Sequence, residues 1–180
     1  MKRKKKLEIA YHEAGHAVAC YRLRVAFNYV TVEPTEDAWG HIMHPCNYLG
    51  KVSEYDDDRR GRWKIEKNIL VLLAGGAAEA LVSGREDWNE SGSSDYEVAL
   101  ALSELIEPTC TDVHGKYLDY MIARARAFVR RRVVHCPIEH LALELMERRR
   151  IGSRTARRII RRSLENDSLT EWLKKREGRL

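Results

Sequence analysis

The sequence predicts a mainly α-helical domain with one small β-hairpin, and three observations carry this prediction. Apolar residues recur at helical spacing along most of the chain. Only two short β-prone runs occur, at residues 29–32 and 40–44, and Pro34, Asp37 and Gly40 mark a turn between them. The hydrophobic content of 44% suffices for a globular core. No apolar run reaches the roughly 18 residues that cross a bilayer.

The first two helices are expected over residues 7–21 and 63–81. Alanines and larger apolar side chains recur at helical spacing in the first. The second becomes apolar on all sides in its C-terminal half, which is typical of a buried helix. Gly75 and Gly76 each cost such a helix about 1 kcal/mol, so they indicate close packing against a neighbour.

The second half of the chain predicts further helices after a polar, glycine-bearing loop over residues 84–94. Pro137 suits the first turn of one of them, and Ser168 and Glu171 have the spacing of a capping box. The chain is therefore divided into a domain over residues 1–164 and a C-terminal helical tail over residues 165–180. The predicted helices cover residues 94–106, 115–134, 137–146, 153–164 and 168–175.

Cysteine usage and charge exclude several classes of protein. The four cysteines lie far apart without a CxxC pair, which predicts reduced structural thiols instead of a four-thiolate site or a disulfide framework. The net charge of +5 is uneven, with basic residues clustered at 2–6 and 148–162. Glu8 and the polar residues after it interrupt the hydrophobic stretch that a signal peptide needs. We therefore expect a cytoplasmic protein.

Residues 12–16 read His-Glu-Ala-Gly-His, an HExxH motif, and they fall within the first predicted helix. Because residues four apart lie on the same face of a helix, His12 and His16 can direct two imidazoles at one point. That geometry suits a zinc ion at about 2.0–2.1 Å. Glu13 lies beside this point, where it can take a proton from zinc-bound water, whose pKa the metal lowers to about 7.

A catalytic zinc takes three protein ligands and a water, so a third ligand must come from elsewhere in the chain. Several downstream carboxylates are candidates. Asp95 and Glu97 fall in the first turn of a predicted helix that opens after a glycine-serine turn, where a carboxylate can project toward a neighbouring helix. The residues alone leave the choice open among Glu79, Glu90, Asp95, Glu97 and Glu104.

Four segments add a resemblance to one known family. Their sequences are Ala-Tyr-His-Glu-Ala-Gly-His-Ala-Val at 10–18, Val-Thr-Val-Glu-Pro at 30–34 with Trp-Gly-His at 39–41, Leu-Leu-Ala-Gly-Gly-Ala-Ala-Glu at 72–79, and Ser-Gly-Ser-Ser-Asp at 91–95. In this order they resemble the proteolytic domain of the FtsH family, the ATP-dependent zinc proteases of bacterial membranes and mitochondria. The resemblance covers about residues 4–160.

The resemblance implies a helical, zincin-like peptidase domain over residues 1–164 with Zn²⁺ as its cofactor. It implies that Asp95, in the fourth segment, is the third metal ligand beside His12 and His16. Glu13 is then the catalytic base. The expected function is a metalloendopeptidase that hydrolyses peptide bonds in unfolded or flexible polypeptides.

Three departures from the family bear on partners and substrates. No GxxxxGK[ST] phosphate-binding loop occurs in this sequence, so a separate ATPase partner is one hypothesis and a homo-oligomer is another. Ala77 stands where the family usually has an arginine, and the stretch after Ile106 is shortened. The last two departures concern substrate choice and hexamer formation and leave the expected ligands untouched.

An alternative function is a non-catalytic module that binds protein or nucleic acid through a basic helix. Arginines at spacings of three and four form one stripe over residues 154–162, opposite Ala156, Ile159 and Ile160. We favour a solvated charged face for this stripe and do not expect nucleic acid as a partner. The members of the stripe are Arg154, Arg157, Arg158, Arg161 and Arg162.

Three further polar residues each keep two interpretations. Glu79, on the buried helix, either accepts a hydrogen bond from a ligand histidine or forms a structural salt bridge. His41 or His44, on the second β-prone run, could stabilise an oxyanion. For both histidines we favour a solvent-facing position on the strand.

Overall fold

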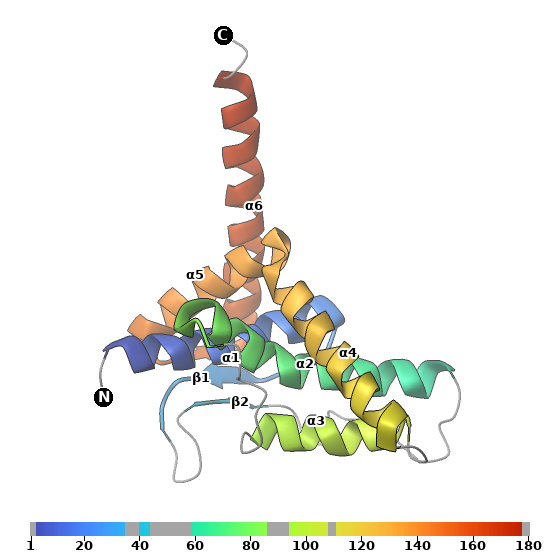
Figure 1. The fold of residues 1–180 in the computed structure, drawn as a ribbon. Helices are drawn as coiled ribbons and strands as arrows, with labels where there is room; N and C mark the ends of the chain where they lie inside the picture. Colours follow the sequence, from blue (N-terminus) through green and yellow to red (C-terminus); the bar gives the residue numbers. More distant parts are fainter. Residues whose placement is uncertain (1–2, 35–39, 44–58, 86–93, 108–110, 178–180) are drawn as a thin grey trace.

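The computed structural model describes residues 3–34, 40–43, 59–85, 94–107 and 111–177 (Figure 1). Over these residues the chain is mostly helical, with a small three-stranded antiparallel sheet, so the predicted fold class is confirmed. The elements are α1 (Arg3–Leu23), β1 (Tyr29–Thr31), β2 (His41–Met43), α2 (Arg59–Ser83), α3 (Ser94–Glu104), α4 (Thr111–Arg130), α5 (Arg132–Arg148), β3 (Arg150–Gly152) and α6 (Ser153–Glu177).

Helix α1 lies at the centre and packs on α2 and α5. Gly15 brings the backbones of α1 and α2 together, because a Cβ at this position would lie 2.5 Å from the Ala74 carbonyl oxygen and 2.7 Å from the Ala78 Cβ. Ala10 and Ala14, on the same helix, are fully buried. The alanines of the first helix therefore form a seam of small side chains that allows this close approach.

The C-terminal half of helix α2 is apolar and buried, as its sequence predicts. Ile69 and Leu73 are buried almost completely, and Ala74 and Ala78 face α1. The helix extends a few residues beyond the predicted 63–81 at each end. A polar group in this buried half must find a partner inside the protein.

The sheet has the strand order β2-β1-β3, and both pairs are antiparallel. Val30 lies opposite Ile42 in β2 and Ile151 in β3. The predicted hairpin is confirmed by the β1–β2 pairing, whereas β3 was not predicted. A strand of three residues has too few positions to show an alternating pattern. Arg149, with φ of 62°, ends α5 and turns the chain into β3.

The boundary between α4 and α5 differs from the prediction. The break falls at Arg131, so Pro137 lies inside α5, beyond its first turn. A proline there removes one backbone hydrogen bond. Pro137 is buried together with Ile138 and Leu141. Packing of this face against the core therefore outweighs the missing hydrogen bond.

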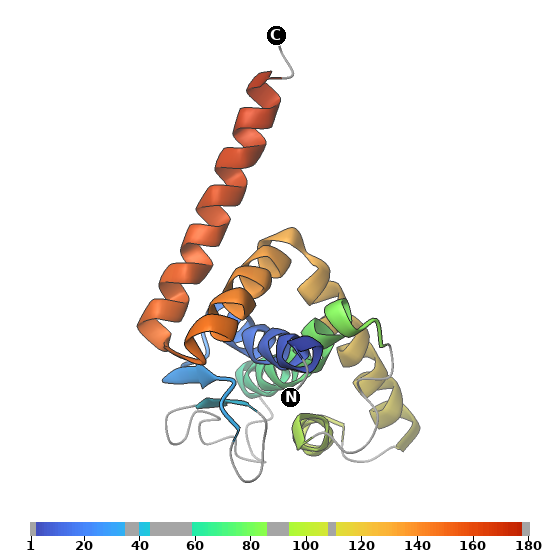
Figure 2. The same cartoon turned by 90° about the vertical axis from the view of Figure 1, so that its left-hand side faces the viewer.

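The last helix also differs from the prediction. Residues 153–164 and 168–175 belong to a single helix, α6, so the capping-box spacing of Ser168 and Glu171 does not begin a new helix. The predicted division at residue 164 falls inside α6 and stays a prediction. In both views the C-terminal part of α6 extends away from the other helices (Figures 1 and 2). None of the described helices is long and apolar enough to span a membrane.

Candidate metal centre

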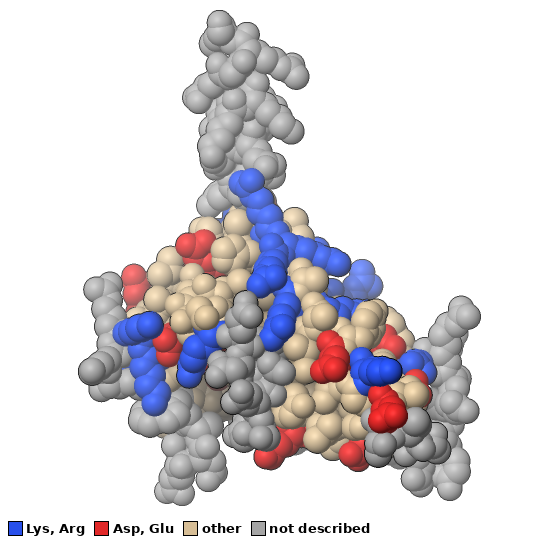
Figure 3. All heavy atoms as spheres, in the orientation of Figure 1, with Lys and Arg blue, Asp and Glu red and all other residues tan. Residues whose placement is uncertain are grey.

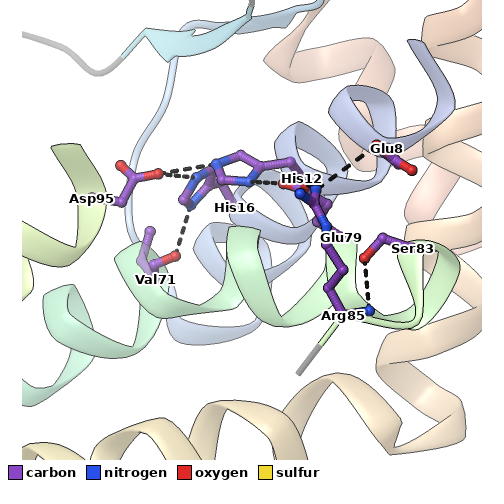
Figure 4. A network of polar contacts seen from close by, with 8 residues as sticks. All are labelled: Glu8, His12, His16, Val71, Glu79, Ser83, Arg85 and Asp95. Atoms are coloured by element: carbon purple, nitrogen blue, oxygen red, sulfur yellow. Dashed lines mark hydrogen bonds and ion pairs between the residues drawn. The ribbon is translucent and has the colours of Figure 1, made fainter. Parts of the chain in front are cut away.

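The HExxH motif lies in the middle of α1, with both histidine rings on the same face. The ring centroids of His12 and His16 are 4.7 Å apart. The two Nε2 atoms lie 3.0 Å and 3.1 Å from one oxygen, Oδ2 of Asp95. Asp95 is the second residue of α3 and projects from that helix toward α1 (Figure 4).

The three side chains offer two imidazole nitrogens and one carboxylate oxygen within 4.8 Å of one another. This is the donor set that zinc takes in catalytic sites. In the part of the chain that the structure describes, no other group of histidine, cysteine and acidic residues has this geometry. His12, His16 and Asp95 thus come together although more than 75 residues separate the motif from the aspartate.

The other candidate carboxylates lie elsewhere. Glu97 and Glu104 are exposed on α3 and do not belong to the cluster. Glu79 contacts the opposite side of the His12 ring from Asp95. Glu90 and His44 lie outside the described residues.

Both rings are oriented through their Nδ1 atoms. His16 Nδ1 donates to the carbonyl oxygen of Val71 at 2.8 Å, and His12 Nδ1 donates to Glu79 Oε2 at 3.1 Å. Because these acceptors carry no proton in this arrangement, Nδ1 must be the protonated nitrogen in a neutral ring. In that neutral form Nε2 is the ring nitrogen that is free to offer a lone pair to a metal, as a ligand requires.

Glu79 satisfies both interpretations considered for it. Its Oε2 accepts from His12, and its Oε1 accepts from Arg85 Nη2 at 2.6 Å. The same guanidinium lies 3.9 Å from Glu8 in α1 (Figure 4). Arg85 and the Val71 carbonyl were not anticipated from the sequence, because neither has a distinctive neighbourhood along the chain.

Gly75 gives the two rings their space. A Cβ at this position would overlap His16 Nε2 and lie 2.9 Å from His12 Nε2. The backbone of α2 therefore passes directly against the imidazoles, and any side chain there would displace them. The close packing indicated by Gly75 in the sequence is confirmed, and the neighbour is the histidine pair itself.

Glu13 is a buried carboxylate close to the histidine pair. Its side chain is 5% exposed, and its Oε2 has no hydrogen-bond partner among the described residues. Burial raises the pKa of this carboxyl, which makes it a better proton acceptor than an exposed glutamate. A Cβ at Gly40 would lie 2.9 Å from Glu13 Oε1, so the start of β2 also approaches this group closely.

The charges of the cluster favour a cation between the rings. Burial acts to lower the pKa of His12, but hydrogen bonds with Asp95 and Glu79 outweigh it and raise the pKa to about 10. Burial likewise acts to raise the pKa of Asp95, and the nearby His16 and His12 hold it well below its usual range. The residues present therefore fit a divalent metal in chemistry as well as in arrangement.

His41 is partly exposed on the strand, and the oxyanion role considered for it stays a prediction. It lies on β2, half-buried, with its Nε2 3.2 Å from the Tyr29 hydroxyl. The two rings meet edge to face at 5.6 Å. The guanidinium of Arg150 lies over the Tyr29 ring, with its Cζ 3.7 Å from the ring centroid. These contacts order the small sheet beside the metal centre.

No family model matches the chain. Part of it is similar to curated proteins named "ATP-dependent zinc metalloprotease FtsH". The protein of Neorickettsia risticii is 30% identical over 105 residues, which are 57% of this chain and 15% of the relative. That of Rickettsia felis is 30% identical over 136 residues, 69% of this chain and 20% of the relative. That of Caulobacter vibrioides is 28% identical over 106 residues, 57% of this chain and 16% of the relative.

These similarities support an FtsH-related region over more than half of the chain. The chain spans no more than 20% of the length of these relatives. Their names therefore apply to proteins several times longer.

Proposed function

We propose that this chain is a zinc-dependent metalloendopeptidase, with His12, His16 and Asp95 as metal ligands and Glu13 as the catalytic base. One observation carries the proposal: two imidazole nitrogens and a carboxylate oxygen converge beside a buried carboxylate that has no hydrogen-bond partner among the described residues. Such a carboxylate costs stability, so a functional role accounts for it better than a structural one.

The residues around the centre have distinct parts in this reaction. A bound zinc would polarise the scissile carbonyl and acidify a water. Glu13 accepts the proton of that water and later delivers it to the leaving amine, and its raised pKa suits both transfers. Glu79 and the Val71 carbonyl hold the histidine rings in place, so the ligands need no rearrangement during the reaction.

The sheet supplies a place for an extended substrate. In the order β2-β1-β3, strand β2 has only one neighbour among the described strands. Its first residue follows Gly40, which approaches the Glu13 carboxylate. A polypeptide that adds to this edge as a further strand would pass the base and the metal ligands. Substrates of this kind are unfolded or flexible chains.

Delivery of folded substrates would require an ATPase, which the names of the relatives associate with FtsH. We retain a separate ATPase partner and a homo-oligomer as hypotheses about the assembly. The alternative of a non-catalytic binding module explains the fold but gives no role to Glu13.

The test combines metal analysis with hydrolysis of unfolded casein. We expect about one zinc per chain in the wild type and in Glu13→Gln, with activity only in the wild type, because Glu13 acts on water and does not hold the metal. Glu147→Gln, an exposed glutamate of α5, is the control and should remain active. Equal activity in wild type and Glu13→Gln would exclude the mechanism, and zinc-loaded wild type without activity would favour the binding module.

A further inference from the structure

A groove lies between the C-terminal end of α1 and the N-terminal half of α6, away from the residues of the metal centre. It consists of two cavities of about 480 Å³ and 450 Å³. Tyr21 and Arg157 line both cavities, so the two lie side by side. We call it the arginine groove, after the five arginines in its walls: Arg22, Arg24, Arg154, Arg157 and Arg161.

Every charged residue that lines the groove is an arginine. No acidic residue lines either cavity. None of its five arginines forms an ion pair within the described part of the chain. Arginines elsewhere do, for example Arg124 with Glu66 at 3.2 Å and Arg148 with Glu144 at 2.6 Å. The walls of the groove therefore hold positive charge that the described protein does not compensate.

The position of these arginines on α6 does not favour the stability of the helix. Arg154 and Arg157 lie in its first two turns, where the helix dipole is positive, and the first turn has no acidic residue. Ala156 and Ile160, on the opposite face, are fully buried and fix α6 to the body. A packed helix thus presents the guanidinium groups to the groove, where a bound anion would relieve the repulsion. Lysine and arginine side chains also gather where α6 leaves the body in the view of Figure 3.

Tyr21 adds an aromatic surface to this charge. It is half-buried at the junction of the two cavities. Arginines around an aromatic ring are the pattern by which proteins hold single strands, with phosphates against the cations and a base stacked on the ring. Binding to an anionic bilayer would be strengthened by an exposed apolar face instead of a single aromatic ring. The apolar face of α6 packs against the core as far as Ser163, so it is not exposed.

We propose that the arginine groove binds single-stranded nucleic acid. The arginine stripe over residues 154–162, for which the sequence favours a solvated face, then has two parts. Arg154, Arg157 and Arg161 belong to the groove, whereas Arg158 and Arg162 line neither cavity. The second helix needed for the groove, α1, could not be identified from the stripe alone.

The division of the stripe supplies a matched pair of variants on one helix. Fluorescence anisotropy with a labelled oligothymidylate of about 20 nucleotides measures the affinity as a function of salt. Each phosphate contact contributes about 0.7 to the slope of log K against log salt. Arg157→Gln with Arg161→Gln should therefore reduce the slope by about 1.4. Arg158→Gln with Arg162→Gln, with the same change in charge, should leave it nearly unchanged.

Tyr21 is tested separately. Tyr21→Ala should weaken binding by about 5- to 150-fold, the effect of losing one stacked base, whereas Tyr21→Phe should bind as the wild type does. Circular dichroism of each variant establishes that it is folded before its affinity is interpreted.

Three results would overturn the proposal. The first is an equal change of slope in the two arginine pairs, which would indicate a general effect of net charge. The second is equally tight binding of a duplex of the same length, which does not expose its base faces. The third is equally tight binding of vesicles with about 30% phosphatidylserine, which would indicate a membrane surface.

Discussion

Helix α1 carries two very different sets of charged groups, one at its middle and one at its C-terminal end. At the middle, His12 and His16 are held on both ring nitrogens by groups from α2 and α3. At the end, Arg22 and, just beyond the helix, Arg24 are exposed and have no ion pair with a described residue. The first set is rigid and closely packed, and the second is open to solvent.

The difference teaches how each site can be changed. In a buried network every group depends on its partners, so removing one leaves another unpaired at a cost of about 1–3 kcal/mol or more. Exposed arginines interact mainly with water, and their loss changes binding of a ligand while the fold persists. Substitutions should therefore separate the two regions by their effect on stability.

The largest effect is expected at Asp95. Asp95→Ala should lower zinc affinity by more than about 100-fold, because a ligand contributes more than the outer groups whose loss costs about 10- to 100-fold. Glu97→Ala, in the same first turn of α3 but exposed, is the matched control and should leave the affinity nearly unchanged. Zinc titration with a competing chelator measures both. A third ligand other than Asp95 would be revealed by unchanged affinity in Asp95→Ala.

Gly75→Ala should have the next largest effect. The added methyl group overlaps His16 Nε2, so zinc binding should be lost and the protein destabilised by about 1–3 kcal/mol. Gly115→Ala is the control, since a Cβ there meets no atom within 4 Å. Alanine in α4 should stabilise the protein by up to about 1 kcal/mol. Chemical denaturation of the two variants tests this, and similar effects of both would contradict the close contact.

Glu13→Gln should change stability in a manner that depends on pH. Burial raises the folded-state pKa of Glu13 above its unfolded value. Such a group contributes stability below the unfolded pKa and loses it as the pH rises through the folded pKa. At pH 7, above the unfolded pKa, the buried carboxyl therefore destabilises the zinc-free protein relative to low pH. Thermal unfolding should show Glu13→Gln above the wild type at pH 7, with the difference decreasing toward pH 4; a pH-independent difference would oppose this explanation.

The smallest effect is expected in the arginine groove. Arg157→Gln with Arg161→Gln should change the free energy of unfolding by less than about 0.5 kcal/mol per substitution, because both side chains are exposed. Denaturant titration at low and high salt measures the change. A loss of several kcal/mol would mean that these arginines belong to the packed structure, and the contrast with the centre would not hold.

Much of the fold could be predicted because it follows local patterns. The helical spacing in α1 and the apolar second half of α2 already indicate their elements, and Gly75 already indicates a close approach. The strand β3 and the place of Pro137 could not be predicted in this way. Both depend on burial against other elements, which outweighs local preference in a three-residue strand or in a helix that contains a proline.

For the sites, the sequence by itself determined the histidine pair, because residues four apart on a helix must share a face. It left five carboxylates open as the third ligand, and only the resemblance singled out Asp95. Tertiary structure alone decided that α3 brings Asp95 to both Nε2 atoms. It also decided that Tyr21 and Arg157, far apart along the chain, line one groove. The physical reason is the same in both cases: spacing along a helix fixes which residues share its face, whereas packing between helices determines what that face meets.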